Sequence, residues 1–360
     1  MSNHDHGGKR GPTALVSDAL ARERAGAVPI APNVGTTMLA RLLSPDFRPF
    51  LIFIVALGGL TLVDGGEGRI LSSVTAFSTL QYFSTFGLVA LGLGLTMVIG
   101  EFDLSVSGVF GLGGCVAVLY GNESIWLGIA CALGVGISFG MAQGFIVTRF
   151  GIGSVPVTLG GLLTANGLAY VVTQNRTVSF DNIDLALLLN ESIATFFSIR
   201  SLVAIAFFMI SIFVFFSTRI GRDLTATGSN RRAALVSGVG VGRIVVCSFA
   251  FSATMSALGG ALLSFSLASA SPAGLADVLV PAIIASILGG ISLAGGVGNP
   301  LGLAAGVVTL SLLRSGLNAL AAPPYANDVA SALILFAVAI ADAPYLLRRF
   351  TAATAWLHRN

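Results

Sequence analysis

The stretch from Ser217 to Arg243 reads STRIGRDLTATGSNRRAALVSGVGVGR and separates two blocks of long apolar segments. It is polar and rich in arginine. Its middle carries the signals of a short helix from Arg231 to Ser237, because Asn230 can cap the first turn and Gly238 can end the last one in a left-handed conformation. Such a helix, about 10 Å long, can dock into a groove of another protein. The alternative is an ordinary basic loop that only sets membrane topology.

The residues on both sides of this stretch are predominantly apolar. Hydrophobic residues make up 55% of the 360-residue chain, charged residues make up 10%, and the mean hydropathy is +0.91. Soluble domains carry about 25% charged residues, so the composition excludes an ordinary soluble protein. Apolar segments near 20 residues long recur along the chain. This pattern predicts an all-α fold, a polytopic bundle of transmembrane helices.

About ten such segments are expected as membrane spans. They are residues 48–64, 76–99, 104–121, 124–147, 153–173, 199–217, 244–267, 277–291, 299–320 and 329–347. Residues 1–47 are polar and lack periodicity, so a disordered cytoplasmic tail is expected there. The membrane domain then covers residues 48–347 and contains the stretch 218–243 as a cytoplasmic loop. Residues 348–360 form a second cytoplasmic tail.

The placement of arginine predicts the orientation of the bundle. If the N-terminus lies inside, most basic residues also lie inside, including the arginines of the 218–243 stretch, and only Arg69, Arg176 and Arg200 lie outside. This distribution fits the positive-inside rule. Both termini are therefore expected in the cytoplasm, with an even number of spans crossing the inner membrane of a bacterium.

The chain lacks the residue patterns of an enzyme. It contains no GxxxxGK[ST] motif for binding nucleotide phosphates, and Lys9 is its only lysine. Its cysteines, Cys115, Cys131 and Cys247, lie within apolar segments and are typical of small core residues. The histidines lie near the two ends of the chain. We therefore expect no catalytic residue, metal, cofactor or nucleic acid partner.

Two carboxylates lie where one apolar segment meets the next, in the stretch Gly100-Glu101-Phe102-Asp103-Leu104-Ser105. A charge at the centre of a bilayer costs ~2.5–3.5 kcal/mol, so both must face water, a cavity or hydrogen-bond donors. Asp103 is expected to N-cap the following helix, with Ser105 near its free N–H groups. The alternative for Asp103 is contact with a substrate. Glu101 either lines a pathway or pairs with an arginine.

A second interruption runs from Leu288 to Pro300, and its glycines preclude a stable helix interior. Pro300 suits the first turn of the next helix, so a loop or broken helix on the cytoplasmic side is expected. Polar residues inside other spans either line a pathway or bond helix to helix, and an arginine there can also pair with an acid. The candidate pathway residues are Glu101, Asp103, Ser105, Asn166, Arg314 and Asn318.

Three stretches, in this order, resemble the permease subunits of bacterial simple-sugar ABC importers, the ribose/xylose/galactose group that also includes a signal-molecule importer. They read MVIGEFDLSVSG, GRDLTATGSNRRAALVSGVGVGR and ILGGISLAGGVGNPLG…LLRSGLNAL, within roughly residues 75–345. The family stretches read GGIDLSVGS, GRxxxAxGGNxxAAxxSGI, and LGGTSLxGGxG with NNGLNL. Glu101 stands where the family usually has glycine, and Arg231–Arg232 are more basic than usual. A polyol, a pentose or a modified sugar would fit as substrate.

The resemblance implies a specific assembly. The family forms a homodimeric or sometimes heterodimeric channel in the inner membrane, surrounded by lipid. A cytoplasmic protein with two fused ATP-binding domains supplies energy, and a periplasmic binding protein delivers substrate. The loop between the sixth and seventh spans couples the permease to the ATPase. The expected coupling residues here are Gly221, Arg222, Gly228, Asn230, Arg231, Arg232, Ala233, Ala234, Ser237 and Gly238.

Two other functions remain open from the residues. A permease for branched-chain amino acids or nucleosides belongs to the same class, since such permeases resemble this group. A secondary transporter driven by protons through Glu101 or Asp103 belongs to a different class and would need no ATPase.

Overall fold

The computed structural model of the chain describes residues 47–274 and 277–336. The expected N-terminal tail, apart from Phe47, and the expected C-terminal tail lie outside these residues. The end of the last predicted span, after Phe336, lies outside them as well.

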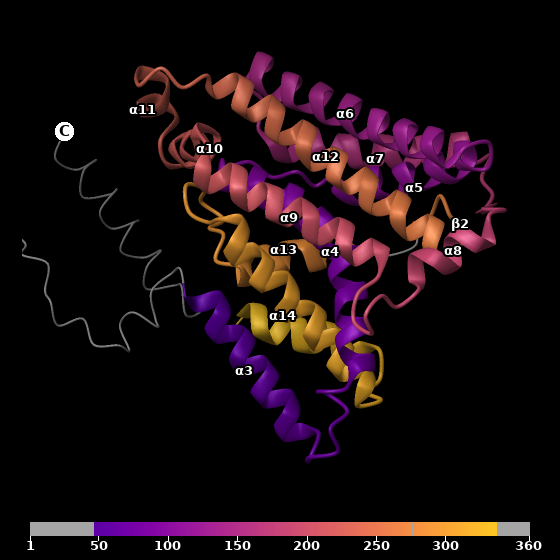
Figure 1. Cartoon of the computed structure of the whole chain (residues 1–360). Coiled ribbons are helices and arrows are strands. Elements are labelled where there is room, and N and C mark those ends of the chain that lie inside the picture. Colours follow the sequence, from indigo (N-terminus) through magenta and orange to yellow (C-terminus); the bar gives the residue numbers. More distant parts are fainter. Residues whose placement is uncertain (1–46, 275–276, 337–360) are drawn as a thin grey trace, which may run out of the picture. The chain divides into compact units, whose positions relative to one another are not determined.

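The described chain is almost entirely helical (Figure 1). The long and intermediate helices are α3 (Arg48–Val63), α4 (Ser73–Val98), α5 (Val106–Gly121), α6 (Ile125–Phe150), α7 (Ser154–Val172), α9 (Ile199–Ser217), α12 (Val241–Ser266), α13 (Leu279–Leu288) and α14 (Pro300–Ala319). The short helices are α8 (Ile183–Asn190), α10 (Arg219–Ser229) and α11 (Arg231–Val236). The final described helix covers Tyr325–Phe336. Two short strands, β1 (Val178–Ser179) and β2 (Ser269–Ala270), pair antiparallel.

Each of the ten predicted spans overlaps one of these helices. Among the described residues, six helices are long and apolar enough to cross a membrane: α4, α6, α7, α9, α12 and α14. The others, α3, α5, α13 and the final described helix, are apolar but shorter. The structure is that of a helical, multi-pass membrane protein, while the count of ten crossings and the cytoplasmic location of both termini remain predictions.

Local sequence signals set the ends of several helices. The Ser72 hydroxyl accepts a hydrogen bond from the Thr75 N–H, and this contact caps the start of α4. Asn299 caps α14 by accepting from the Gly302 N–H at 2.8 Å, and Pro300 occupies the first turn, as the sequence predicts. These short polar caps satisfy backbone N–H groups that have no partner within the helix.

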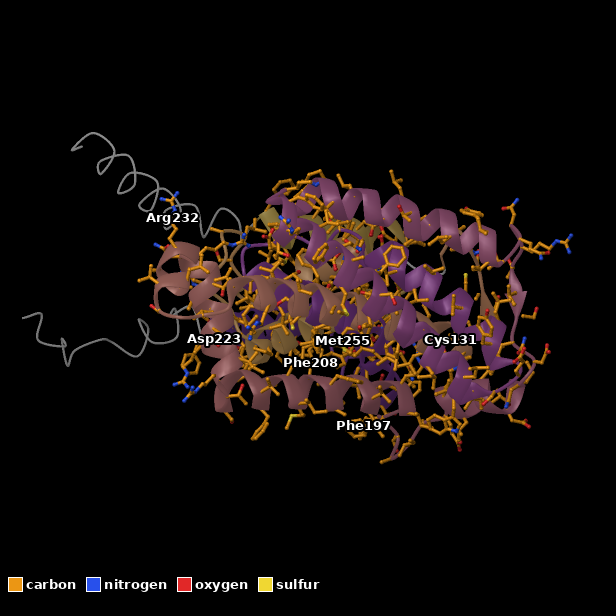
Figure 2. All side chains as sticks on the ribbon, turned by 90° about the horizontal axis from the view of Figure 1, so that it is seen from above. Cys131, Phe197, Phe208, Asp223, Arg232 and Met255 are labelled. Carbon is orange, nitrogen blue, oxygen red and sulfur yellow. The ribbon has the colours of Figure 1, made fainter. Side chains whose placement is uncertain are left out.

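Helices α4 and α12 form the centre of the bundle. Most of each is buried, and α4 contacts α12 on one side and α13 and α14 on the other (Figure 1). Their backbones touch, because a Cβ at Gly92 of α4 would lie 2.6 Å from the Ser252 Cα of α12. Figure 2 shows Phe208 of α9 and Met255 of α12 in this interior, and both are buried. Helices α6, α7 and α9 expose most of their apolar surface, as lipid-facing helices do.

Candidate functional site

The polar stretch between α9 and α12 forms two helices where the sequence analysis expects one. The expected short helix is α11, and it ends at Val236, one residue earlier than predicted. Its cap is confirmed, since the Asn230 Oδ1 accepts from the Ala233 N–H at 3.1 Å. The left-handed end is confirmed too, because Gly238 has a φ of +84° and donates its N–H to the Leu235 carbonyl. The preceding helix, α10, was not predicted.

Helix α11 presents apolar side chains to solvent at a polar end of the molecule. Ala234 is buried against the bundle, whereas Ala233, Leu235 and Val236 are exposed, Val236 to 90%. Figure 2 shows Arg232 projecting away from the bundle beside them. Exposed apolar side chains next to an arginine are typical of a surface that binds another protein.

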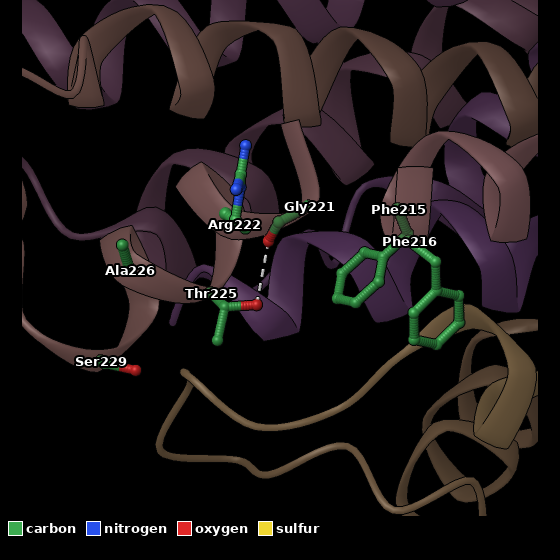
Figure 3. A pocket seen from close by; sticks show the side chains of 7 residues that line it. All are labelled: Phe215, Phe216, Gly221, Arg222, Thr225, Ala226 and Ser229. Atoms are coloured by element: carbon green, nitrogen blue, oxygen red, sulfur yellow. Dashed lines mark hydrogen bonds between the residues drawn. The ribbon is translucent and has the colours of Figure 1, made fainter. Parts of the chain in front are cut away.

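A sharp turn joins α9 to α10. A Cβ at Gly221 would lie 1.9 Å from the Phe215 carbonyl oxygen, so only glycine fits there. The turn leaves a hollow of about 410 Å³, which Figure 3 shows, lined by Phe215, Phe216, Gly221, Arg222, Thr225, Ala226 and Ser229. The Thr225 hydroxyl donates to the Gly221 carbonyl at 3.0 Å along one wall of this hollow. Two expected coupling residues therefore border this hollow on α10, Gly221 buried at the turn and Arg222 exposed.

The three stretches that carry the resemblance meet at one place, at the end of α10. A Cβ at Gly228 would lie 1.9 Å from the Val98 carbonyl oxygen and 2.5 Å from the Gly296 nitrogen. The Gly296 N–H donates to that same Val98 carbonyl at 2.8 Å. A Cβ at Gly295 would lie 2.7 Å from the Gly100 Cα. We call this contact of α10 with the α4–α5 connector and the α13–α14 connector the junction.

Backbone conformation explains why the junction consists of glycines. Gly100, Gly295 and Gly296 have φ angles of +77°, +75° and +77°, in a region that side chains disfavour. The absent side chains also allow three backbones to approach within contact distance. The segment after Leu288, predicted as a loop or broken helix, is a loop that carries two of these glycines.

An ion pair closes one side of the junction. Arg231, the first residue of α11, donates through its Nη2 to the Glu101 Oε1. The Glu101 side chain is buried, and the Arg231 side chain is 45% exposed. Of the two alternatives left open for Glu101, the structure shows pairing with an arginine. The pair joins the α4–α5 connector directly to the helix that was predicted to dock.

Asp103 lies on the other side of the same connector and is fully buried. The prediction that it N-caps α5 is wrong, because the N-cap position is Ser105. The Asp103 Oδ1 instead accepts from the Ser105 N–H at 3.1 Å and from its hydroxyl at 2.6 Å, which forms a tight local turn. Gln143 of α6 donates to the Ser105 hydroxyl at 3.0 Å. The Ser252 hydroxyl also lies near the carboxylate, although Oδ2 accepts no hydrogen bond of standard geometry from the part of the chain that the structure describes.

The start of α7 holds the connector from a further direction. The Ser154 hydroxyl accepts from the Phe102 N–H at 3.0 Å, and the Thr158 hydroxyl donates to the Phe102 carbonyl at 3.1 Å. Sequence reasoning missed Gln143, Ser154 and Thr158. Their only sequence signal is that they are polar residues within or at the start of apolar segments.

The candidate pathway residues fall into separate places. Glu101 lies at the junction, and Asp103 and Ser105 lie on the other side of the same connector. Arg314 and Asn318 lie on one face of α14, away from it, where the Asn318 amide donates to the Tyr82 hydroxyl of α4 at 2.8 Å. The remaining candidate, Asn166, is exposed on α7, a helix that contacts α5 and α6. The candidates therefore form two separate groups, and Asn166 belongs to neither.

Arg200, predicted in an outer loop, is buried in the first turn of α9. Its Nη2 donates to the Thr85 hydroxyl at 2.9 Å, and its Nη1 lies 3.5 Å from the Asn190 Oδ1. No carboxylate among the described residues lies within 4.0 Å of it. This guanidinium therefore ties α9 to α4 and α8 through neutral groups.

A family model described as "Branched-chain amino acid transport system / permease component" matches residues 75–339, a range that contains all three stretches of the junction. The chain belongs to this permease family. It is 31% identical over 263 residues to the L-arabinose transport system permease protein AraH of Escherichia coli, covering 72% of this chain and 79% of AraH.

Two further relatives belong to importers. The chain is 28% identical over 300 residues to the ribose import permease protein RbsC of Haemophilus influenzae, covering 82% of this chain and 92% of RbsC. It is 30% identical over 300 residues to the autoinducer 2 import system permease protein LsrC of Photorhabdus laumondii, covering 81% and 87%. These relatives confirm the predicted resemblance to simple-sugar ABC permeases. No solved structure matches the chain.

Proposed function

We propose that this chain is the permease subunit of an ATP-driven importer that moves a simple sugar or a related polyol across the inner membrane of a bacterium. The arabinose, ribose and autoinducer 2 permeases that it resembles support this function. The importer needs a cytoplasmic ATP-binding subunit, a periplasmic substrate-binding protein and a second permease subunit, which we take to be an identical copy.

The observation that carries the proposal is the junction. A displacement of α10 and α11 acts on the α4–α5 connector through Glu101 and Gly100, and on the α13–α14 connector through Gly295 and Gly296. These connectors lead into helices on both sides of the central helix α4. One movement at the 218–243 stretch can therefore shift both halves of the bundle together.

In this mechanism, no covalent chemistry takes place in the permease. Closure of the ATP-binding subunits moves α11, which docks through its exposed Ala233, Leu235 and Val236. The junction passes that movement to the helices, and the pathway opens toward the opposite side of the membrane. Among the candidate pathway residues, Arg314 and Asn318 lie on a face that a substrate can contact.

Replacing Val236 with aspartate tests the docking surface. Val236 is 90% exposed, so the variant should fold and insert normally, but a charge in a protein interface is costly. We expect uptake and substrate-stimulated ATP hydrolysis to fall about tenfold or more, at unchanged abundance in the membrane. The matched control is Leu71→Asp, at a 73% exposed apolar position between α3 and α4. Normal uptake by the Val236→Asp variant would reject the coupling role of α11.

The family description favours one alternative, a permease for branched-chain amino acids. An uptake panel of labelled pentoses, polyols and leucine separates it from the sugar importer. A proton-driven transporter is tested by reconstituting the chain alone in liposomes with a pH gradient. Sugar uptake there, without ATP, would support proton coupling and contradict the ATP-driven mechanism.

A further inference from the structure

A cluster of polar and aromatic side chains lies on α4, α14 and the final described helix. We call it the Arg314 group, and its members are Tyr82, Arg314, Asn318, Asn327 and Asp328. Tyr82 lies sixteen residues before Val98 on the same helix, so the group is about 24 Å along α4 from the junction. Charged and amide side chains within membrane helices normally face a protein partner or a water-filled space.

Hydrogen bonds link the amides of the group in a row. The Asn327 amide donates to the Asn318 Oδ1 at 3.4 Å, and the Asn318 amide donates to the Tyr82 hydroxyl at 2.8 Å. The Tyr82 ring lies parallel to the Phe86 ring, with centroids 6.0 Å apart. The Arg314 guanidinium covers that Phe86 ring, 4.8 Å from its centroid. Phe86 is itself buried, so the half-buried Tyr82 ring is the aromatic face left beside these planar donors and acceptors.

The group has more hydrogen-bonding capacity than its own members use. Within residues 47–274 and 277–336, the Arg314 Nε, the Asn327 Oδ1 and the Ser311 hydroxyl one turn earlier on α14 are buried without a partner. The only carboxylate within 4.0 Å of Arg314 among the described residues is Asp328, at that limit, and its side chain is 84% exposed. A buried polar atom without a partner costs about 1–3 kcal/mol, so such atoms commonly mark a missing ligand or water.

The chemistry of the group identifies the class of ligand. We propose that the Arg314 group is a subsite for neighbouring hydroxyl groups of a neutral sugar or polyol in transit. A hydroxyl both donates and accepts, so two adjacent hydroxyls can use the Arg314 donor together with the Asp328 and Asn327 acceptors. The half-buried Tyr82 ring suits the apolar face of a sugar ring. One cation and one anion balance each other, which favours a neutral ligand over an anionic one.

This subsite rests on the proposed function, because it assigns a place in the pathway to the imported sugar. If the group served only helix packing, we would expect its amides to be paired with each other. We would not expect Arg314 to have its carboxylate partner, Asp328, as far away as 4.0 Å. A second permease copy seated on this face is the competing occupant. Substitutions in a subsite should change the preference among sugars, whereas substitutions in a dimer interface should reduce the uptake of all sugars equally.

The test compares Asn318→Ala and Asp328→Asn in cells that carry each variant in place of the native gene. Both positions are exposed, so neither substitution creates a cavity. Uptake of tritiated D-ribose, L-arabinose, D-xylose and ribitol is measured at saturating concentration, where the binding protein is fully loaded. We expect the preferred compound to lose about tenfold in rate, while the others change less, because their hydroxyls use the group less well. Thr164→Ala, on the exposed face of α7, is the control and should keep the native preference.

The outcomes separate this inference from the proposed function. An equal loss for all four compounds, or no loss, overturns the subsite and leaves the importer intact. An equal loss accompanied by loss of the dimer assigns the face to a second copy. If cells with the native chain take up none of the four, the assignment of the subsite to these compounds falls, while an importer of another simple sugar stands.

Discussion

The junction and the Arg314 group are built in opposite ways. At the junction, backbones of three segments touch through glycines, and a single ion pair closes one side. In the Arg314 group, side chains from three helices meet, and two of their buried polar atoms have no partner among the described residues. Helix α4 is common to both, with the junction after its last turn and the Arg314 group near its middle.

The difference separates transmission from binding. A contact between backbones has no rotamers to absorb a displacement, so it passes movement from α10 to both connectors. A group of long side chains with spare donors and acceptors can rearrange around a ligand. We infer that the same helix carries movement from one region and responds to substrate in the other.

Gly228→Ala should give the largest effect. Its Cβ would lie 1.9 Å from a backbone oxygen, so α10 has to move away from the α4–α5 connector. Overpacking of this kind costs about 1–3 kcal/mol, and a contact with rigid backbone lies at the upper end. We expect lower thermal stability of the purified chain, measured as the fraction remaining monodisperse after heating, together with loss of uptake.

The control for this variant is Gly242→Ala in the first turn of α12. No atom of the described residues lies within 4 Å of a Cβ at that position, and alanine favours the helix. Stability of the Gly242→Ala variant should match or exceed that of the native chain. If the Gly228→Ala variant were as stable as the native chain, the backbones at the junction would not be in tight contact. The contrast between the junction and the Arg314 group would then be wrong.

The Glu101–Arg231 pair should give an intermediate effect. Because Arg231 is half exposed, the pair contributes only about 0.2–1 kcal/mol to stability, but it fixes the position of α11 against the connector. We expect Glu101→Arg to lower uptake several-fold, since it places two cations together. The double variant Glu101→Arg with Arg231→Glu should recover much of that loss, as rate measurements in a double-mutant cycle would show.

Arg232 provides the matched control for the pair. It is adjacent in sequence, exposed, and without an ion pair among the described residues. Arg232→Glu should not rescue Glu101→Arg. Equal rescue by either substitution would mean that only net charge near α11 matters, and that the junction does not depend on this particular contact.

Sequence reasoning identified the parts of the junction but not their contact. Helix α11, its cap at Asn230 and its end at Gly238 follow from local rules, because caps and left-handed glycines depend on neighbouring residues. The ten apolar segments follow from hydropathy in the same way. Helix α10 was missed, because Gly221 and Gly228 oppose a helix locally and are needed for contacts with segments far along the chain.

The contacts of individual side chains could not be predicted for the same reason, because they join segments that are far apart in the sequence. Glu101 and Arg231 are both visible as departures from the family pattern, yet nothing in a single sequence pairs positions 130 residues apart. Asp103 was assigned to the cap because aspartate favours that position, and Ser105 occupies it instead. The partners of Arg314, including Tyr82 and Asp328, come from two other helices and depend on tertiary packing.

The smallest expected effect comes from removing the cap of α11, and the same substitution in the Arg314 group serves as its comparison. Asn230→Ala removes the cap of α11 and should cost about 1 kcal/mol locally, whereas Asn230→Ser keeps a capping oxygen. We expect faster hydrogen exchange of the α11 amides in the alanine variant, with uptake of all sugars reduced by one common factor. Asn318→Ala should instead leave α11 exchange unchanged and alter the preference among sugars. The contradicting outcome is that Asn230→Ala and Asn318→Ala change the preference among sugars in the same way. In that case α4 would couple the junction to the Arg314 group so strongly that transmission and binding could not be assigned to separate regions.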